Sequence, residues 1–128
     1  MTASASRAAA EQRILELHAA TCSILAHPTR LAMIEALRDG ERTVSELVRA
    51  VGTTAGNLSQ HLGAMRQAGV VDSRRDGRYA FYRISDARIL TAFRLMREVL
   101  LGRLARDARM AARVTRPVRR TNRHATSQ

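Results

Sequence analysis

The chain has 128 residues, a length that suits one domain with a modest hydrophobic core and that favours dimerisation as a further source of stability. It carries 22 basic and 11 acidic side chains, so its formal net charge is +11, and all 22 basic side chains are arginine. This charge indicates a polyanionic partner, since it attracts phosphate groups regardless of their sequence. The single cysteine excludes an intrachain disulfide framework and is typical of a reducing compartment.

No targeting segment or membrane span is evident. The first residues lack the apolar stretch of a signal peptide, and no apolar run approaches the length of a membrane span. We therefore expect a cytoplasmic protein without membrane contact. The chain also lacks paired catalytic carboxylates, a nucleophile motif, a phosphate-binding glycine loop and a cofactor fingerprint, so we expect neither an enzyme nor a bound cofactor.

The N-terminal part predicts one helix. Residues 1–7 are small and polar and are expected to be disordered, and the helix occupies residues 8–25. Its broad apolar stripe comprises Ile14, Leu17, Thr21 and Ile24, with His18, Cys22 and Leu25 beside them. This width predicts burial against a partner as well as against the helix's own domain. A break at His27 follows, and Pro28 is well placed as the first residue of a second helix that ends near Gly40.

Residues 43–68 predict two short amphipathic helices joined by a tight turn. Thr43 and Glu46 form a T-x-x-E capping box that begins the first helix, and Gly52 ends it. One of the two threonines that follow caps the second helix. Apolar side chains recur at helical spacing in both, at Val44, Leu47, Val48 and Val51 and then at Leu58, Leu62 and Met65.

The second of these helices has an uncharged outward face, which is unusual in a chain so rich in arginine. The outward residues are Gly56, Ser59, Gln60, Gly63 and Gln67, with Asn57 to one side. Small residues with Asn, Gln and Ser suit a face that contacts base edges, as the second helix of a helix-turn-helix does in the major groove. An ordinary helical hairpin has the same spacing, so this pattern alone leaves both interpretations open.

Residues 70–85 predict a β-hairpin. The strand-forming side chains are Val71, Tyr79, Phe81 and Tyr82, and Asp76-Gly77 is a two-residue hairpin signal. Four arginines lie in the same segment, at positions 74, 75, 78 and 83. A helix-turn-helix followed at once by a basic hairpin indicates a winged helix. The predicted fold is mainly α with a small β-hairpin, a winged helix-turn-helix of about five helices plus a two-stranded wing.

A last long helix begins after Asp86. Its apolar positions Ile89, Phe93, Met96, Leu100 and Leu104 form a narrow seam of the kind that packs one helix against another. Residues 8–104 therefore form the expected DNA-binding and dimerisation domain. Residues 105–128 read as an Arg-rich, largely disordered extension, and from position 103 onward eight arginines face one acid, Asp107. We expect this extension to bind phosphates non-specifically, the alternative being a purely solubilising tail.

Four short motifs carry a family resemblance that covers roughly residues 14–102. They are HPTRL at the start of the second helix, LSQHL in the outward-facing helix, AGVV before the wing and FYRI in its second strand. With these motifs the chain resembles the ArsR/SmtB family of small dimeric repressors. The resemblance implies a homodimer formed through the first and last helices. It also implies double-stranded operator DNA with an inverted repeat as the partner.

Seven positions are expected to contact DNA. Two of them, Arg75 and Arg78, follow from their place in the wing, and the resemblance carries over to the five that match the family's recognition helix: Thr54, Asn57, Ser59, Gln60 and His61. Asn57 or Gln60 is the best candidate for a bidentate contact with adenine. Arg75 and Arg78 flank the wing turn, where a guanidinium can enter the minor groove or bind phosphate. The neighbouring arginines 74 and 83 are expected to bind phosphate or to pair with Asp72 and Asp76, and Arg30 is expected to be structural.

The signal that releases DNA is less evident. The family's cysteine metal pattern is replaced by residues 43–47, TVSEL, and in its D-x-H pattern Asp86 is kept but Arg88 replaces the histidine, so no metal site is predicted. His18 and Cys22, four residues apart on one helix face, are the candidate sensor, through redox or sulfur chemistry or, as a weaker alternative, through metal binding. The small inducer is unknown. An alternative function is a non-specific architectural DNA-binding protein driven by the basic tail.

Overall fold

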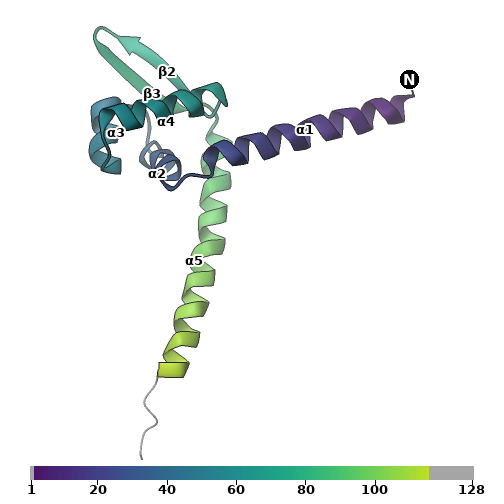
Figure 1. The fold of residues 1–128 in the computed structure, drawn as a ribbon, viewed down its shortest axis with the longest axis vertical. Coiled ribbons are helices and arrows are strands. Elements are labelled where there is room, and N and C mark those ends of the chain that lie inside the picture. The colour runs from purple at the N-terminus through teal and green to yellow at the C-terminus, as the bar shows by residue number, and fades with distance from the viewer. Residues whose placement is uncertain (1, 116–128) are drawn as a thin grey trace, which may run out of the picture. The chain divides into compact units, whose positions relative to one another are not determined.

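The computed structural model describes residues 2–115 and confirms a winged helix-turn-helix (Figure 1). Its helices are α1 (Ala3–Leu25), α2 (Pro28–Ala36), α3 (Val44–Val51), α4 (Ala55–Gln67) and α5 (Ala87–Thr115). Its strands are β1 (Arg42–Thr43), β2 (Val71–Asp76) and β3 (Tyr79–Ile84). The chain divides into two compact units between Ala92 and Phe93, and each is described by itself. None of the described helices is both long and apolar enough to span a membrane.

The hydrophobic core lies within the first unit, where α2, α3 and α4 pack on one another and on the start of β2. Its buried side chains are Met33, Ile34, Leu37, Leu47, Leu58, Leu62, Met65, Val70 and Val71. The inward positions predicted for α4 are all confirmed. In α2, Met33 and Ile34 are buried, whereas Leu31 is 40% exposed.

The ends of the two central helices follow from local side-chain and backbone chemistry. The Thr43 hydroxyl accepts a hydrogen bond from the Glu46 amide at 3.2 Å and donates to the Glu46 carboxylate at 3.2 Å, which confirms that this pair of residues caps the helix. Gly52 ends α3 with a φ of +78°, a conformation that glycine adopts at little cost. Thr54, the second of the two candidate threonines, caps α4 by accepting from the amide of Asn57 at 3.2 Å.

The wing is part of a three-stranded antiparallel sheet in the order β1-β3-β2. The short strand β1 was not predicted from the sequence, because two residues are too few to show an alternating pattern. Asp76 pairs with Tyr79, so the two turn residues are Gly77 and Arg78, one position later than the predicted Asp76-Gly77 turn. Gly77 has a φ of +60°, and its place as the first turn residue is typical of a type II′ hairpin.

Both long helices extend further than the sequence predicts. The expectation of disorder over residues 1–7 is wrong for most of that segment, because α1 begins at Ala3, where the Thr2 hydroxyl accepts from the amide of Ala5. At the other end, α5 continues to Thr115 through a stretch rich in alanine and arginine, with one methionine, all of which are strong helix formers. The expectation of disorder from residue 105 is therefore wrong as far as residue 115, and the rest of that expectation lies outside the described residues.

Neither α1 nor α5 buries a single residue within the described chain. The exposed large apolar side chains of α1 are Ile14, Leu15 and Leu17. Those of α5 are Leu95, Met96, Val99, Leu100, Leu101, Leu104, Met110 and Val114. Each set exposes contiguous apolar surface of a kind that marks interaction sites in folded proteins.

Candidate nucleic-acid interface

The outward face of α4 is polar, uncharged and accessible. Burial of Leu58, Leu62 and Met65 fixes the rotation of the helix, and the helical period then turns the intervening residues outward. Among these outward residues, Thr54, Asn57, Ser59 and Gln60 are exposed, as predicted from the sequence. Their amides and hydroxyls are groups that can pair with base edges or phosphates.

These exposed side chains differ in the hydrogen bonds that they already make within the chain. The Asn57 side-chain amide donates to the Thr53 hydroxyl at 2.8 Å, and the Thr54 hydroxyl accepts from the Asn57 backbone. Gln60 makes no side-chain hydrogen bond to any residue that the structure describes. An amide nitrogen carries two N–H groups, so Asn57 keeps one N–H and its oxygen free beside its bond to Thr53. Both side chains can therefore make a bidentate contact with adenine, and Gln60 is the less constrained of the two.

His61 makes an internal contact in addition to its predicted place on the DNA-facing helix. Its side chain is half-buried, and its Nδ1 accepts a hydrogen bond from Nε of Arg30 at 3.0 Å. The ring also meets that of His27 edge-on, with 5.5 Å between centroids. Burial, followed by the charge of Arg30 and then His27, lowers the pKa of His61 below its ordinary value. The expectation that Arg30 is structural agrees with this contact.

Two arginines of the wing form no ion pair with an acidic side chain of residues 2–115. Arg75 lies opposite Ala80 on the sheet, and Arg78 is the second residue of the turn. Both are exposed, and neither forms an ion pair with any acid in the part of the chain that the structure describes. They are the wing cations available to phosphate or to a narrow groove.

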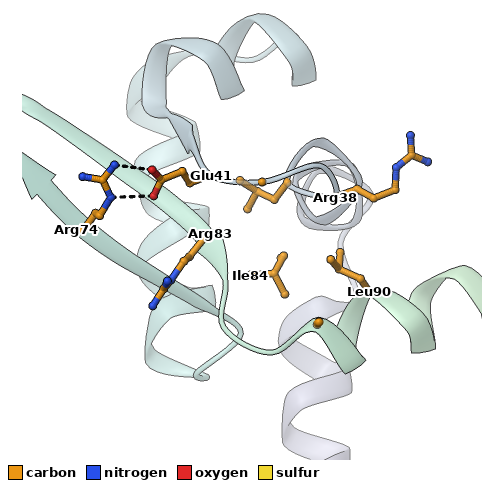
Figure 2. A pocket seen from close by; sticks show the side chains of 9 residues that line it. Arg38, Glu41, Arg74, Arg83, Ile84 and Leu90 are labelled. Atoms are coloured by element: carbon orange, nitrogen blue, oxygen red, sulfur yellow. Dashed lines mark hydrogen bonds and ion pairs between the residues drawn. The ribbon is translucent and has the colours of Figure 1, made fainter.

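Arg74, the immediate neighbour of Arg75, is committed to an internal pair. Its Nε and one terminal nitrogen donate to the two carboxylate oxygens of Glu41, as Figure 2 shows, with the Nε bond at 2.9 Å. Its guanidinium also lies 4.4 Å from the centre of the Phe81 ring. The hydrogen bond from Arg74 lowers the pKa of Glu41, so the carboxylate stays ionised. The predicted partners of Arg74 were Asp72 and Asp76, and a partner 33 positions away leaves no sequence signal.

The other wing arginine expected to be paired, Arg83, lies 3.9 Å from Asp72, so that predicted pair is present but long. Arg83 also borders a hollow of about 550 Å³ between the end of α2, the sheet and the start of α5. In Figure 2, Ile84 and Leu90 face this hollow, whereas the guanidinium groups of Arg38 and Arg83 point away from it. The hollow is therefore aliphatic, and its charged groups already serve other contacts.

Residues 2–115 hold no group of three or more His, Cys, Asp or Glu side chains arranged to bind a metal ion. Asp86 instead accepts hydrogen bonds from the side chain and backbone of Arg88, which lower the pKa of Asp86 to about 2. His18 and Cys22 are both exposed on α1. The two candidate sensor residues are thus accessible in a single chain.

Comparison with known proteins gives close matches in sequence. Residues 27–73 match the sequence profile of the bacterial regulatory proteins of the arsR family. The chain is 41% identical over 88 residues to the HTH-type transcriptional regulator Rv0081 of Mycobacterium tuberculosis, a match that spans 68% of this chain and 77% of the relative. It is 40% identical over 87 residues to the biofilm growth-associated repressor of Agrobacterium fabrum, spanning 66% and 74% of the two chains.

Solved structures agree with these matches. The crystal structure of Rv0081 superposes with a TM-score of 0.68 at 38% identity, over 74% of this chain and 96% of the other. The homodimeric winged helix-turn-helix DNA-binding domain of Mb0332 from Mycobacterium bovis gives 0.68 at 30% identity, over 73% and 87%. With Rv0081 so similar over 77% of its length, the chain belongs to the arsR family of bacterial regulatory proteins: it is a winged helix-turn-helix, DNA-binding regulator of transcription and not an enzyme.

Proposed function

We propose that the protein is a homodimeric repressor that binds an inverted-repeat operator and thereby blocks transcription in the cytoplasm, where bacterial DNA lies. The observation that carries this proposal is the uncharged polar face of α4 beside a wing with two unpaired arginines. A face of this kind suits sequence-dependent contacts in the major groove, and the wing supplies contacts that do not depend on sequence.

In this proposal α4 enters the major groove by its N-terminal end. Gln60 makes the principal base contact, because its amide has no internal partner among the described residues. Asn57 contributes a second contact through its oxygen and its second N–H, while its bond to Thr53 holds the side chain in place. Thr54 and Ser59, exposed on the same face, bind phosphate or base edges. Arg30 occupies Nδ1 of His61, so the contact proposed for His61 is a donation from its Nε2.

Arg75 and Arg78 bind the DNA backbone or the minor groove on the flank of each half-site. Both are exposed on the wing, and Arg78 lies in the turn between β2 and β3, beyond the residues of β3 that pair with β1. Their contacts add affinity and fix the orientation of the protein but do not select a sequence, apart from groove width.

The dimer is proposed to form through the apolar faces of α1 and α5. These two helices bury no residue within one described chain, although they carry Ile14, Leu17, Leu100 and Leu104 at helical spacing. Homodimeric Mb0332 shares the fold at 30% identity. A two-fold axis would place the two α4 helices in successive major grooves, roughly 34 Å apart, and so requires an inverted repeat.

The Arg-rich end of the chain is proposed to bind phosphates without regard to sequence. In the helical part, Arg103, Arg106, Arg109 and Arg113 recur every three or four residues and form no ion pair with any acid of residues 2–115. If this non-specific binding to phosphates dominated the affinity for DNA, the protein would instead be an architectural DNA-binding protein. The polar face of α4 favours the specific repressor, since non-specific binding needs no uncharged reading face.

Cys22, with His18 one turn away, is proposed as the sensor. The thiol is exposed in the single chain and lies on α1, one of the two helices assigned to the dimer interface. Oxidation or persulfide formation there would alter the interface and hence the spacing of the two α4 helices. The small inducer itself is not identified by these residues.

The base contacts can be tested by substituting Gln60. We expect Gln60→Ala to reduce the preference for operator over random DNA by about 1–3 kcal/mol, because each lost bidentate pair removes discrimination of that size. The two affinities are measured at physiological salt by fluorescence anisotropy, with the DNA upstream of the protein's own gene as operator. Arg78→Gln is the matched control and should weaken both complexes alike. Equal loss on both DNAs for Gln60→Ala would contradict the assignment.

The dimer can be tested by placing a charge in the α5 seam. Leu100→Glu should convert a dimer into a monomer, because a carboxylate would be buried without a partner at the interface. The mass in solution is measured by light scattering after gel filtration. Ala105→Glu adds the same charge outside the seam and should leave the mass unchanged. A monomeric wild-type protein, or a dimeric Leu100→Glu variant, would refute this interface.

The basic extension can be tested by truncation after Leu104. We expect weaker binding to all DNA and a shallower dependence of affinity on salt, since each phosphate contact contributes about 0.9 to that slope. The triple variant with Arg106, Arg109 and Arg113 changed to Gln retains the helix and should show part of the same effect. An unchanged slope would remove the extension from the binding surface. If the truncated chain bound operator and random DNA equally well, the architectural alternative would replace the repressor.

The sensor can be tested with the reduced protein on operator DNA, treated in turn with an oxidant, a persulfide donor and Zn²⁺. We expect the oxidant or the persulfide to dissolve the complex and Cys22→Ser to abolish the response, because the variant has no thiol to modify. His18→Gln separates metal binding from sulfur chemistry, since only the former needs the imidazole. Binding that is specific but indifferent to every treatment would exclude Cys22 as the sensor.

A further inference from the structure

Arg30 connects the end of α1 to the helix assigned to read DNA. One terminal nitrogen of its guanidinium donates to the backbone carbonyl of Ile24 at 2.6 Å, and its Nε donates to Nδ1 of His61 at 3.0 Å. Ile24 belongs to the last turn of α1 and His61 to the middle of α4. The planar guanidinium thus holds the two helices through two directional hydrogen bonds.

This connection needs a neutral imidazole at position 61. Nδ1 accepts from Arg30, so it must carry a lone pair, and the ring's proton lies on Nε2. A second proton would turn Nδ1 into a donor that faces a permanent cation. Among the described residues, the charged or titratable groups facing the ring are Arg30 and, edge-on, His27, and no carboxylate compensates them.

We propose that Arg30 is a positioning residue that orients α4 through the neutral imidazole of His61, so that protonation of His61 releases α4 and weakens DNA binding. The inference concerns the control of the α4 surface and rests on the proposed DNA-reading role of that helix. It uses neither Cys22 nor an inducer. His61 lies one turn from Asn57 and next to Gln60 on α4.

The sign of this effect distinguishes it from ordinary histidine behaviour. Protonating an exposed histidine adds positive charge and strengthens binding to DNA. Here protonation removes an acceptor and adds repulsion against Arg30, so binding weakens as the solution becomes acidic. Burial beside Arg30 and His27 lowers the pKa of His61 from its ordinary value of 6.5. The folded protein therefore binds fewer protons than the unfolded chain near that pH, and its stability also falls with acidification below 6.5.

The experiment compares operator binding at pH 7.5 and pH 5.5 at constant ionic strength. We expect the wild-type protein to lose at least about fivefold in affinity at the lower pH, the size of one lost hydrogen bond. His61→Asn places a non-titrating acceptor near the position of Nδ1 and should bind with similar affinity at both pH values. His27→Gln is the control and should still lose affinity in acid, because His61 and Arg30 both remain. Wild-type binding that is unchanged or tighter in acid, or a His61→Asn variant that stays pH-dependent, would overturn the proposal.

A second measurement needs no DNA and therefore separates this inference from the proposed function. The titration of the His61 ring is followed by NMR in the free protein, where we expect a midpoint below 6.5. Arg30→Met should raise that midpoint, because it removes the guanidinium charge. If this variant does not fold, Arg30→Gln tests the same point, since it also removes the charge. A His61 midpoint that neither variant moves would refute the role of Arg30, whereas equal binding to operator and random DNA at every pH would refute the proposed function alone.

Discussion

Burial of one face of α4 is the constraint on which the functional surface depends. Leu58, Leu62 and Met65 are almost fully inaccessible, and together they fix how the helix is rotated about its axis. The 3.6-residue period of the helix then turns Ser59 and Gln60 outward. A core residue and a reading residue are therefore adjacent in the chain, and their roles are separated by helix geometry alone. Loss of core packing would change the reading face before any contact residue was altered.

The wing applies the same logic with a period of two. Arg74 and Arg75 are neighbours, but successive strand residues point to opposite faces. Arg74 lies with Phe81 and pairs with Glu41, which precedes β1, so this arginine holds the hairpin to the start of the helix-turn-helix. Arg75 has no such partner among the described residues. One arginine thus positions the wing and the next remains available to DNA, although both have the same charge and similar exposure.

Local chemistry explains what the sequence could predict. The capping box at Thr43, the helix end at Gly52 and the inward face of α4 all depend on residues within a few positions of one another, and all were predicted. The Glu41–Arg74 and Arg30–His61 contacts join residues 33 and 31 positions apart, so only the folded chain reveals them. The latter contact gives the candidate site residue His61 an internal hydrogen bond, because this residue lies at the edge of the buried face of α4.

The start of α5 departs from the metal-binding pattern of the family. In the family pattern an aspartate and a histidine two residues later bind metal, whereas here Arg88 donates to the carboxylate of Asp86 and keeps its pKa near 2. The aspartate is thus already neutralised by a guanidinium, which offers no lone pair to a metal. Arg30 offers a different connection to α4, because it joins the last turn of α1, which also carries Cys22, to the middle of α4.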